Sequence, residues 1–407
     1  MRLLWILLVA VTFLIVSCKS PPSPVSAPQK RDTLVLQELV SKDTVLANIL
    51  DTNNLKKLVV DSFYQLRDSL VFIEQPMARM TLSADKYEMV KTKIISLQKE
   101  TVANLVLEQQ KMDKKSNHAI LGLTSKSFSP MAALGGETGI DGKEVNRVMR
   151  EVKQNLQGKK SQRIILNGVQ LNPQLKQLDF RNFGIVTPVQ DQGDYHPNCW
   201  AFAACGAYES AYQIANGHQS IKLCEQSILN CSDGVIDPVT GEGVAYKVLE
   251  WLVQINTDKL SPECNYKGRK VNCTEDDAPS DSPTGYWGLV APDYRLTSIA
   301  STDQIKEALC RYGPVTTSLF YDKNWKDYRG GVVREVEASA RLLHTVLIIG
   351  WNETLQAWLI KNSYGSGWGY NCPESGYKGN NTGYMWVAYG AGKIGMRTAF
   401  IVPDPKK

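Results

Sequence analysis

The stretch from Pro188 to Ala203, PVQDQGDYHPNCWAFA, constrains this chain more than any other part of it. A turn that contains Gln192 and Gly193 is followed by Cys199 and then by an apolar run of small residues. Such a run after a turn predicts a buried helix that begins at the cysteine. A thiol at the N-terminus of a helix lies at the positive end of the helix dipole, which favours the thiolate.

Two further polar residues stand at the ends of predicted strands far downstream. His344 leads the apolar segment HTVLIIGW, and Asn362 follows the strand AWLIK. A cysteine, a histidine and an amide that orients the histidine are the parts of an activated thiol nucleophile. We therefore predict a site built from Cys199, His344 and Asn362.

Six blocks of sequence, taken in order, resemble the papain family of cysteine peptidases. LDFRNFGIVTPVQDQG resembles the mature N-terminus of that family, NCWAFA its nucleophile block, and LCEQSILNC its "LSEQ…C" segment. GPVTTSLFYD, HTVLIIGW and IKNSYGSGWG resemble its C-terminal half. The blocks cover about Leu178 to Val402, which is the length of a single domain.

The resemblance implies a role for each of four residues. Cys199 would attack the peptide carbonyl, and His344 would take the thiol proton and deliver it to the leaving amine. Asn362 would orient His344, and Gln192 would form an oxyanion hole with the backbone N–H of Cys199. An acyl-enzyme would form, and water would release it. Cys205 in the same helix is instead expected to be a small buried hydrophobe.

The remaining histidines are weaker candidates for the base. His196 is near Cys199 in sequence, but it belongs to an inserted loop with Pro197, which favours a position on the rim of the site. His118 falls in a region of helical pattern and His218 in a polar turn. With only four scattered histidines and no paired C-x-x-C spacing, the sequence implies no metal and no other cofactor.

The chain departs from the family pattern near the nucleophile. The family's extra cysteine before the nucleophile is missing, and so is its partner, in whose place residues 240–243 read TGEG. Glu242 would then replace a glycine of the substrate groove next to Gly243. Its carboxylate is expected to favour basic residues of a bound peptide in a neighbouring subsite, less so in high salt.

Matching by position to the family implies a second substrate subsite. Its predicted lining is Ser318, Leu342, Leu343 and Thr398. This lining is uncharged and partly apolar, which predicts aliphatic or aromatic side chains two residues before the cut. Trp368 matches a tryptophan that shields the His–Asn pair, and Tyr364 stands where the family usually has another.

Nine cysteines are typical of an exported protein. By resemblance, Cys231 and Cys273 form a disulfide, and a second bridge between Cys224 and Cys264 is plausible because each lies shortly upstream. The sequence leaves open the pairing of five cysteines: Cys205, Cys224, Cys264, Cys310 and Cys372.

The N-terminus has the pattern of a targeting segment. Arg2 precedes the apolar run Leu3–Val16, and Cys18 follows small residues in a way that resembles the bacterial lipoprotein box. We predict a signal peptide over 1–17, a lipidated Pro/Ser-rich tether over 18–31, and export to a membrane surface that faces the periplasm or the cell exterior. A plain secretory signal and an uncleaved anchor are the alternatives, although the run is short for a membrane span.

The rest of the chain divides into two predicted regions. Residues 32–168 lack cysteine and tryptophan and show helical periodicity, with helices over 54–72, 84–114 and 143–156 and a loop over 127–142. This region is interpreted either as a propeptide or as an accessory helical domain. Residues 169–407 are the predicted catalytic domain, with helices over 200–213, 224–229 and 244–255 and strands over 315–320, 345–349, 357–361, 384–388 and 399–402.

Helices first and strands later indicate an α+β fold of two lobes. The resemblance makes these a helical lobe and an antiparallel β-barrel-like lobe. It also predicts a cysteine endopeptidase with protein or peptide substrates, and the net charge of +5 without a Lys/Arg block does not favour nucleic acid. Two other functions stay open: transglutaminase-like acyl transfer, which usually has Asp where Asn362 stands, and an inactive surface-binding protein. The oligomeric state is not predicted.

Overall fold

The computed structural model describes residues 104–405, except for 106, 114–117, 123, 128, 130, 138–141, 160, 195, 233–240, 256–264, 274–284, 293–297, 338–339 and 341. All of these residues belong to one compact unit, 55–407. The predicted signal peptide, the tether, the helix over 54–72 and most of the helix over 84–114 lie outside the described residues. Of the last helix, residues 104–105 and 107–113 are described and are helical.

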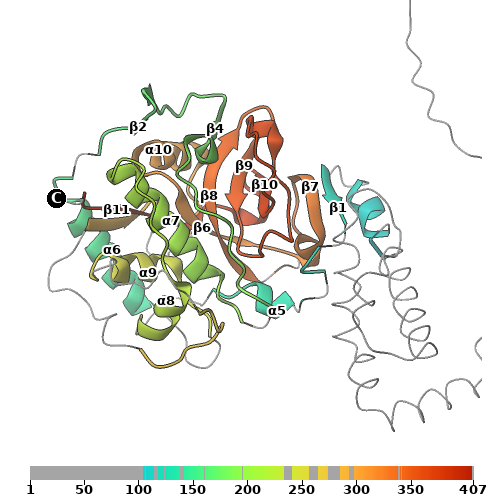
Figure 1. Ribbon diagram of the computed structural model, residues 1–407, viewed down its shortest axis with the longest axis horizontal. Coiled ribbons are helices and arrows are strands. Elements are labelled where there is room, and N and C mark those ends of the chain that lie inside the picture. Colours follow the sequence, from blue (N-terminus) through green and yellow to red (C-terminus); the bar gives the residue numbers. More distant parts are fainter. Residues whose placement is uncertain are drawn as a thin grey trace, which may run out of the picture. The chain divides into compact units, whose positions relative to one another are not determined.

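One helix forms the centre of the helical half. α7 (Cys199–Ala215) begins at the predicted cysteine, and nearly all of its residues are buried, as expected for a helix that is apolar on every side. α8 (Glu225–Cys231) and α9 (Ala245–Leu252) pack against it. α6 (Gly142–Leu156) lies on the same side of the molecule and packs against strand β5 (Figure 1).

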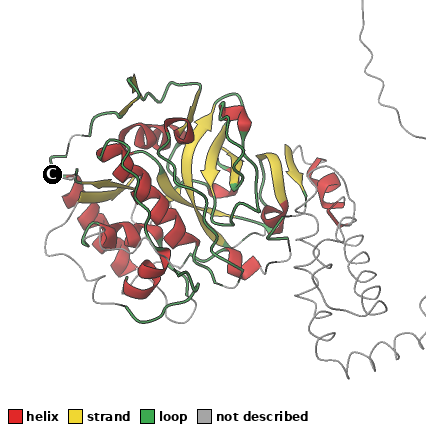
Figure 2. Cartoon of the chain, viewed as in Figure 1, coloured by secondary structure: helices red, strands yellow, loops and turns green. Residues whose placement is uncertain are grey.

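The other half is a mostly antiparallel sheet that helices flank (Figure 2). Its strand order is β1 (His118–Leu121), β7 (Tyr328–Val333), β10 (Tyr384–Ala388), β9 (Ala357–Lys361), β8 (Leu343–Asn352), β6 (Val315–Phe320), β11 (Met396–Pro403) and β5 (Gly285–Leu289). β4 (Gln177–Asp179) pairs with β8, and β10 runs parallel to β7. Helices and strands together confirm the predicted α+β class.

Several elements of the fold were not among the predictions. α10 (Thr302–Tyr312) starts with a capping box between Ser301 and Gln304, a signal that is visible in the sequence. β7 contains two adjacent glycines and lacks a clear alternation, and His118 opens a strand although it falls in a region of helical pattern. The remaining short elements are α5 (Met131–Leu134), β2 (Ile165–Leu166), β3 (Val169–Gln170), η1 (Phe180–Phe183), η4 (Lys323–Asp327), η5 (Pro373–Ser375) and η6 (Ala391–Lys393).

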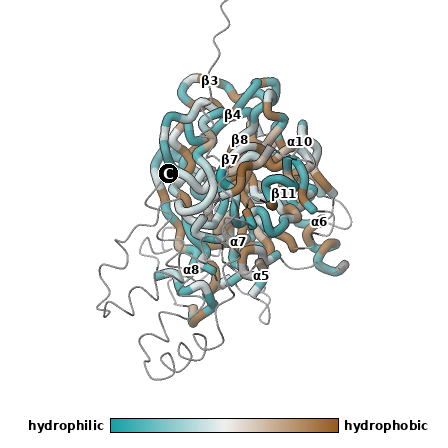
Figure 3. Tube along the Cα trace, turned by 90° about the vertical axis from the view of Figure 1, so that its right-hand side faces the viewer, coloured by the Kyte–Doolittle hydropathy of each residue, from teal (hydrophilic) through white to brown (hydrophobic). Residues whose placement is uncertain are grey.

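A close contact joins the helical half to the sheet. A Cβ atom on Gly206 of α7 would lie 3.0 Å from Cδ2 of Leu347 on β8, so a glycine allows the helix to approach the strand this closely. The same helix carries Cys199 and the same strand carries His344. Hydrophobic residues run through the interior segments and hydrophilic residues lie mainly on the outer turns (Figure 3).

The cysteines divide into bridged and free ones. Cys231 and Cys273 form a disulfide, with 4.9 Å between their Cα atoms. Cys224 is also bridged, to a partner outside the described residues. The free cysteines of the described chain, Cys199, Cys205, Cys310 and Cys372, are all buried. Within the part of the chain that the structure describes, we find no helix with the length and apolar character needed to span a membrane.

Candidate active site

The nucleophile candidate sits where the helical half meets the sheet. Cys199 is the first residue of α7, so its thiol lies at the positive end of the helix dipole. The preceding Asn198 is held in place because its side-chain amide donates to Tyr266 Oη (2.8 Å) and to the Gly268 carbonyl (2.6 Å). Cys199 Sγ accepts a hydrogen bond from the backbone N–H of Thr345 at 3.4 Å, which brings the thiol next to strand β8 at His344.

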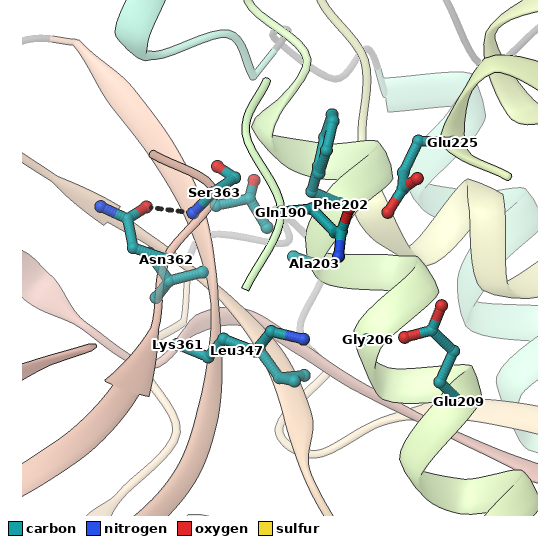
Figure 4. Close-up of a pocket in the computed structure, with 12 residues that line it drawn as sticks. Gln190, Phe202, Ala203, Gly206, Glu209, Glu225, Leu347, Lys361, Asn362 and Ser363 are labelled. Carbon is teal, nitrogen blue, oxygen red and sulfur yellow. Dashed lines mark hydrogen bonds between the residues drawn. The ribbon is translucent and has the colours of Figure 1, made fainter. Parts of the chain in front are cut away.

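The candidate base is oriented by an amide. His344 Nε2 lies 2.7 Å from Asn362 Oδ1. The backbone N–H of Ser363 donates to the same Oδ1 at 2.8 Å (Figure 4). Because a backbone donor already bonds this atom, it is the amide oxygen, and His344 Nε2 must carry the proton. In the neutral ring, Nδ1 then keeps its lone pair, and it makes no well-formed hydrogen bond within the described chain. The imidazole is therefore in the tautomer that accepts a proton at Nδ1.

Gln192 is anchored next to this pair. It is buried, its Oε1 accepts from Ser363 Oγ at 2.5 Å, and its backbone N–H donates to the Ser363 carbonyl at 2.8 Å. These bonds fix the amide so that Nε2 remains a donor, and this atom now reaches the His196 carbonyl at 3.3 Å. The ring of His196 itself lies against Gly268.

Aromatic rings enclose the histidine. The ring centroid of Tyr364 lies 5.1 Å from that of His344, and Trp368 packs edge-on against Tyr364 at 5.1 Å. Tyr321 and Trp325 lie on other sides of His344, with centroids at 5.4 and 6.2 Å. Trp368 is completely buried behind Tyr364, so it supports the His344–Asn362 pair through Tyr364.

A segment of the N-terminal region covers the site. The Gly136 N–H donates to the Leu343 carbonyl (3.0 Å), and the Gly243 N–H donates to the Gly136 carbonyl (3.1 Å). Tyr364 Oη donates to the carbonyl of Leu134 at 2.9 Å. Two residues predicted to bind substrate, Gly243 and Leu343, therefore bind the backbone of this segment with their own backbone groups.

The covering segment fits because its contacts require glycine. Gly136 has φ +134°, and a Cβ atom on it would lie 2.0 Å from the Pro197 carbonyl oxygen. On the opposite wall, a Cβ atom on Gly243 would lie 2.5 Å from the ring of Trp200. The prediction of a loop over 127–142 is thus wrong for residues 131–134, which form the short helix α5. The residues around Gly136 that follow this helix are packed against the candidate site.

Ion pairs fix the segment beyond these backbone contacts. Lys126 Nζ, which is buried, bonds Asp191 Oδ1 at 2.7 Å and Asp194 Oδ1 at 2.8 Å, on either side of Gln192. At the other end, Glu137 pairs with Arg397. The sequence analysis did not predict these ion pairs. A lysine or a glutamate in a polar loop has the same sequence pattern whether it is exposed or buried in an ion pair.

The other predicted substrate residues have mixed positions. Ser318 and Thr398 are buried, whereas the side chain of Leu342 is exposed (42%). Glu242 is half-buried next to Gly243. The described residues contain no cluster of three or more His, Cys, Asp or Glu side chains suited to a metal ion.

Covering the site changes the proton affinities of both reactive groups. Burial raises the pKa of the Cys199 thiol to about 12 and lowers the pKa of His344 to about 4, against a smaller opposite effect of Asn362. The covered site therefore holds a neutral thiol and a neutral imidazole.

A pocket behind Asn362 is a separate feature (Figure 4). It is lined by Glu209, Glu225 and Lys361 among others, and neither Cys199 nor His344 lines it. Lys361 Nζ donates to Thr187 Oγ1 at 3.0 Å, and burial lowers the pKa of Lys361 to about 8. Thr187 bonds both Glu209 of α7 and Lys361 of β9, so this buried cluster links the two elements next to Asn362.

We expect Gly136→Ala to uncover the site. The added methyl group clashes with Pro197, and strain of about 1–3 kcal/mol corresponds to about 5- to 150-fold in the population of the open state. A small thiol reagent should then label Cys199 at least about fivefold faster than in the unchanged protein. Gly158→Ala is the matched control, because Gly158 also has positive φ but a Cβ atom there meets nothing within 4 Å. Equal labelling rates in all three proteins would contradict the close contact at Gly136.

Comparison with known proteins places this geometry in a family. A profile described as "Papain family cysteine protease" matches residues 175–397. Cysteine proteinase A of Leishmania mexicana is 32% identical over 207 residues, 49% of this chain and 53% of that protein. Thiol protease aleurain of Arabidopsis thaliana is 27% identical over 233 residues, 55% of this chain and 59% of that protein. The chain thus spans about half the length of the curated relatives it matches.

Solved structures agree with this assignment at the level of the fold. Procathepsin L2 proteinase from the larval midgut of Tenebrio molitor has a TM-score of 0.53 at 20% identity and covers 81% of this chain and 96% of its own. Procathepsin L 3 from the same source has a TM-score of 0.52 at 18% identity, with the same coverage. The match over residues 175–397 on this fold shows that the chain belongs to the papain family of cysteine proteases.

Proposed function

We propose that this protein is a cysteine endopeptidase that hydrolyses peptide bonds in protein or peptide substrates. The observation that carries the proposal is the tautomer of His344, whose Nε2 proton points to Asn362 Oδ1, which leaves Nδ1 as a base. The next residue, Thr345, bonds Cys199 Sγ with its backbone N–H. The family match supports the same chemistry.

In the proposed reaction, His344 accepts a proton and then returns it in each of the two steps, acylation and deacylation. When the site opens, the proton of the Cys199 thiol moves to His344 Nδ1, and the thiolate attacks the peptide carbonyl carbon. The Cys199 N–H and Gln192 Nε2 donate to the oxyanion, for which Gln192 gives up its long bond to the His196 carbonyl. His344 Nδ1–H then protonates the leaving amine. It next removes a proton from water, which attacks the thioester and regenerates the thiol.

We further propose that the segment Lys126–Glu137 inhibits the enzyme as part of a propeptide. Its backbone occupies the groups of Gly243 and Leu343 that a peptide substrate would use, and it buries the thiol completely. Proteins named procathepsin align with 81% of the chain, which includes part of the N-terminal region. An accessory domain without an inhibitory role would not need its glycines against the nucleophile loop.

The site favours hydrolysis over the two alternatives. Transglutaminase-like transfer usually has an acidic third member, whereas here Asn362 Oδ1 accepts from both His344 and the Ser363 backbone. An inactive binding protein would not require a correctly oriented base. Peptide turnover distinguishes these functions, because a transferase would pass the acyl group to an added amine and an inactive binding protein would show no turnover.

Replacing the nucleophile or the base should abolish hydrolysis. In protein whose segment has been released, Cys199→Ser and His344→Ala should each lower the turnover of a peptide substrate by at least about 10³-fold. Cys205→Ser and His196→Ala are the matched controls and should keep most of the activity. Hydrolysis by the Cys199→Ser protein would contradict the proposal. Transfer of the acyl group to an added amine, without hydrolysis, would instead indicate a transferase.

Acid should favour release of the segment between about pH 6.5 and pH 4. The pKa of His344 is about 4 when covered and returns toward its ordinary value of 6.5 when exposed. The open state therefore binds more protons in this window, and opening gains up to about tenfold per pH unit. Burial raises the pKa of Glu137 in the covered state, so protonation of Glu137 favours the covered state as the pH falls. The experiment is therefore done in Glu137→Gln protein, in which this opposing effect is absent.

The measurement is hydrogen exchange at the Gly136 amide, corrected for the intrinsic effect of pH, in Cys199→Ser protein that cannot cut itself. Exchange should accelerate as the pH falls, and His344→Gln should flatten the dependence. Protection that stays constant or increases toward pH 4 would contradict the linkage.

We also propose that the protein is an exported lipoprotein whose membrane anchor is Cys18. The support is the small-residue box before Cys18 and the Pro/Ser-rich stretch after it. Cys18→Ser should release the protein from membranes while the Cys199 site still reacts with an epoxide inhibitor. If a radiolabelled fatty acid marks the wild type and Cys18→Ser equally, this residue is not the anchor.

A further inference from the structure

The covering segment places one charged side chain inside the cleft. Glu137 lies next to the groove glycine, in an isolated parallel bridge with Gly243, and its side chain is 1% exposed. Its Oε1 pairs with Arg397 Nη1 at 3.2 Å, and the Arg397 side chain is only 9% exposed. An ion pair shielded from water to this degree is screened weakly by salt.

Part of the predicted second subsite lies around this pair, although the Thr398 hydroxyl bonds Thr317 Oγ1 at 3.0 Å and so points to the other face of β6 from Ser318. Arg397 lies on β11 directly before Thr398, and the register of β11 with β6 pairs Met396 with Ser318. Burial raises the pKa of Glu137, while the charge of Arg397 and the Ser318 hydroxyl oppose this rise. The carboxyl group therefore lies beside a cation that the protein itself supplies, and within the described chain neither of its oxygens makes a hydrogen bond of good geometry.

This finding changes the expectation for the pocket. Its lining is uncharged when only Ser318, Leu342, Leu343 and Thr398 are considered, which predicts apolar substrate side chains. Arg397 adds a guanidinium that is buried in the covered state, and Leu342 is exposed. The side chain that the covering segment places against Arg397 is a glutamate, not an apolar residue.

We propose that Arg397 makes this pocket selective for a peptide side chain that carries a carboxylate, with glutamate as the preferred residue. This inference rests on the proposed peptidase function. When Glu137 leaves, Arg397 loses the carboxylate that it contacts in the covered state, at 3.2 Å. A peptide glutamate restores a charge-assisted contact that a glutamine or leucine of similar size does not provide. Glu137 is in this view a stand-in for the substrate side chain.

The test uses the full chain with Glu137→Ala, so that its own carboxylate does not compete. Four matched peptides differ only in having Glu, Gln, Leu or Lys two residues before the cut. Their cleavage rates are normalised to the number of sites that react with an epoxide inhibitor. The glutamate peptide should be cleaved with a kcat/KM about tenfold or more above that of the glutamine peptide. Arg397→Gln should abolish this ratio, and Arg397→Glu should reverse it in favour of a lysine peptide. Arg150→Gln, an exposed arginine on α6, is the matched control and should leave the ratio unchanged.

The proposal would be overturned if the enzyme that retains Arg397 preferred the leucine peptide. It would also be overturned if Arg397→Gln left the ratio of the glutamate to the glutamine peptide unchanged. Binding of the same peptides to Cys199→Ser with Glu137→Ala, measured by fluorescence anisotropy, separates this failure from a failure of the proposed function. A protein that binds the glutamate peptide most tightly but cleaves none of them supports the pocket and contradicts the peptidase. Tight binding of the leucine peptide contradicts the pocket alone, whatever the protein cleaves.

Discussion

The packing of α7 against β8 is the contact on which the rest of the site depends. The thiol comes from the first residue of the helix and the imidazole from the start of the strand, so their distance is set by how closely the two elements approach. Gly206 removes the side chain that would hold them apart at Leu347. The N–H of Thr345 then reaches Cys199 Sγ, which ties the register of the strand to the position of the nucleophile.

The hydrogen bonds around Asn362 decide which nitrogen of His344 carries the proton. One amide oxygen accepts from the Ser363 backbone and from His344, so the tautomer is decided by local geometry before any substrate arrives. The aromatic rings of Tyr364, Tyr321 and Trp325 exclude water from the ring. Exclusion of water strengthens each of these bonds, because the interior has a lower effective dielectric than solvent.

The covering segment uses the same physics to hold the site in a neutral state. Burial alone moves the pKa values of Cys199 and His344 away from each other in the direction that disfavours a thiolate–imidazolium pair. The segment is held by a buried lysine at one end and a buried glutamate at the other, each paired with charges on the catalytic domain. Desolvation makes the Glu137–Arg397 pair sensitive to the loss of one partner, whereas the two aspartates that bind Lys126 are nearly half exposed.

The sequence by itself determined the parts of the site that depend on local patterns. The turn before an apolar run predicted a helix that begins at Cys199, and the apolar segments predicted the strands that carry His344 and precede Asn362, as the structure has them. The strand Tyr328–Val333 escaped prediction because its glycines carry no alternation, and its place in the sheet depends on pairing with β1 and β10.

Only the tertiary structure decided what surrounds the reactive residues. That a polar loop at Gly136 lies in the cleft, and that Arg397 meets Glu137 there, depends on contacts between residues far apart in the chain. A periodic pattern reports which face of an element is buried, but it does not report which charged residue meets which across two elements. The cysteine that we propose as the nucleophile can therefore be identified from the sequence, because its signal is a local pattern. The charge beside the proposed substrate pocket depends on the fold, because it comes from residues that are distant in the sequence.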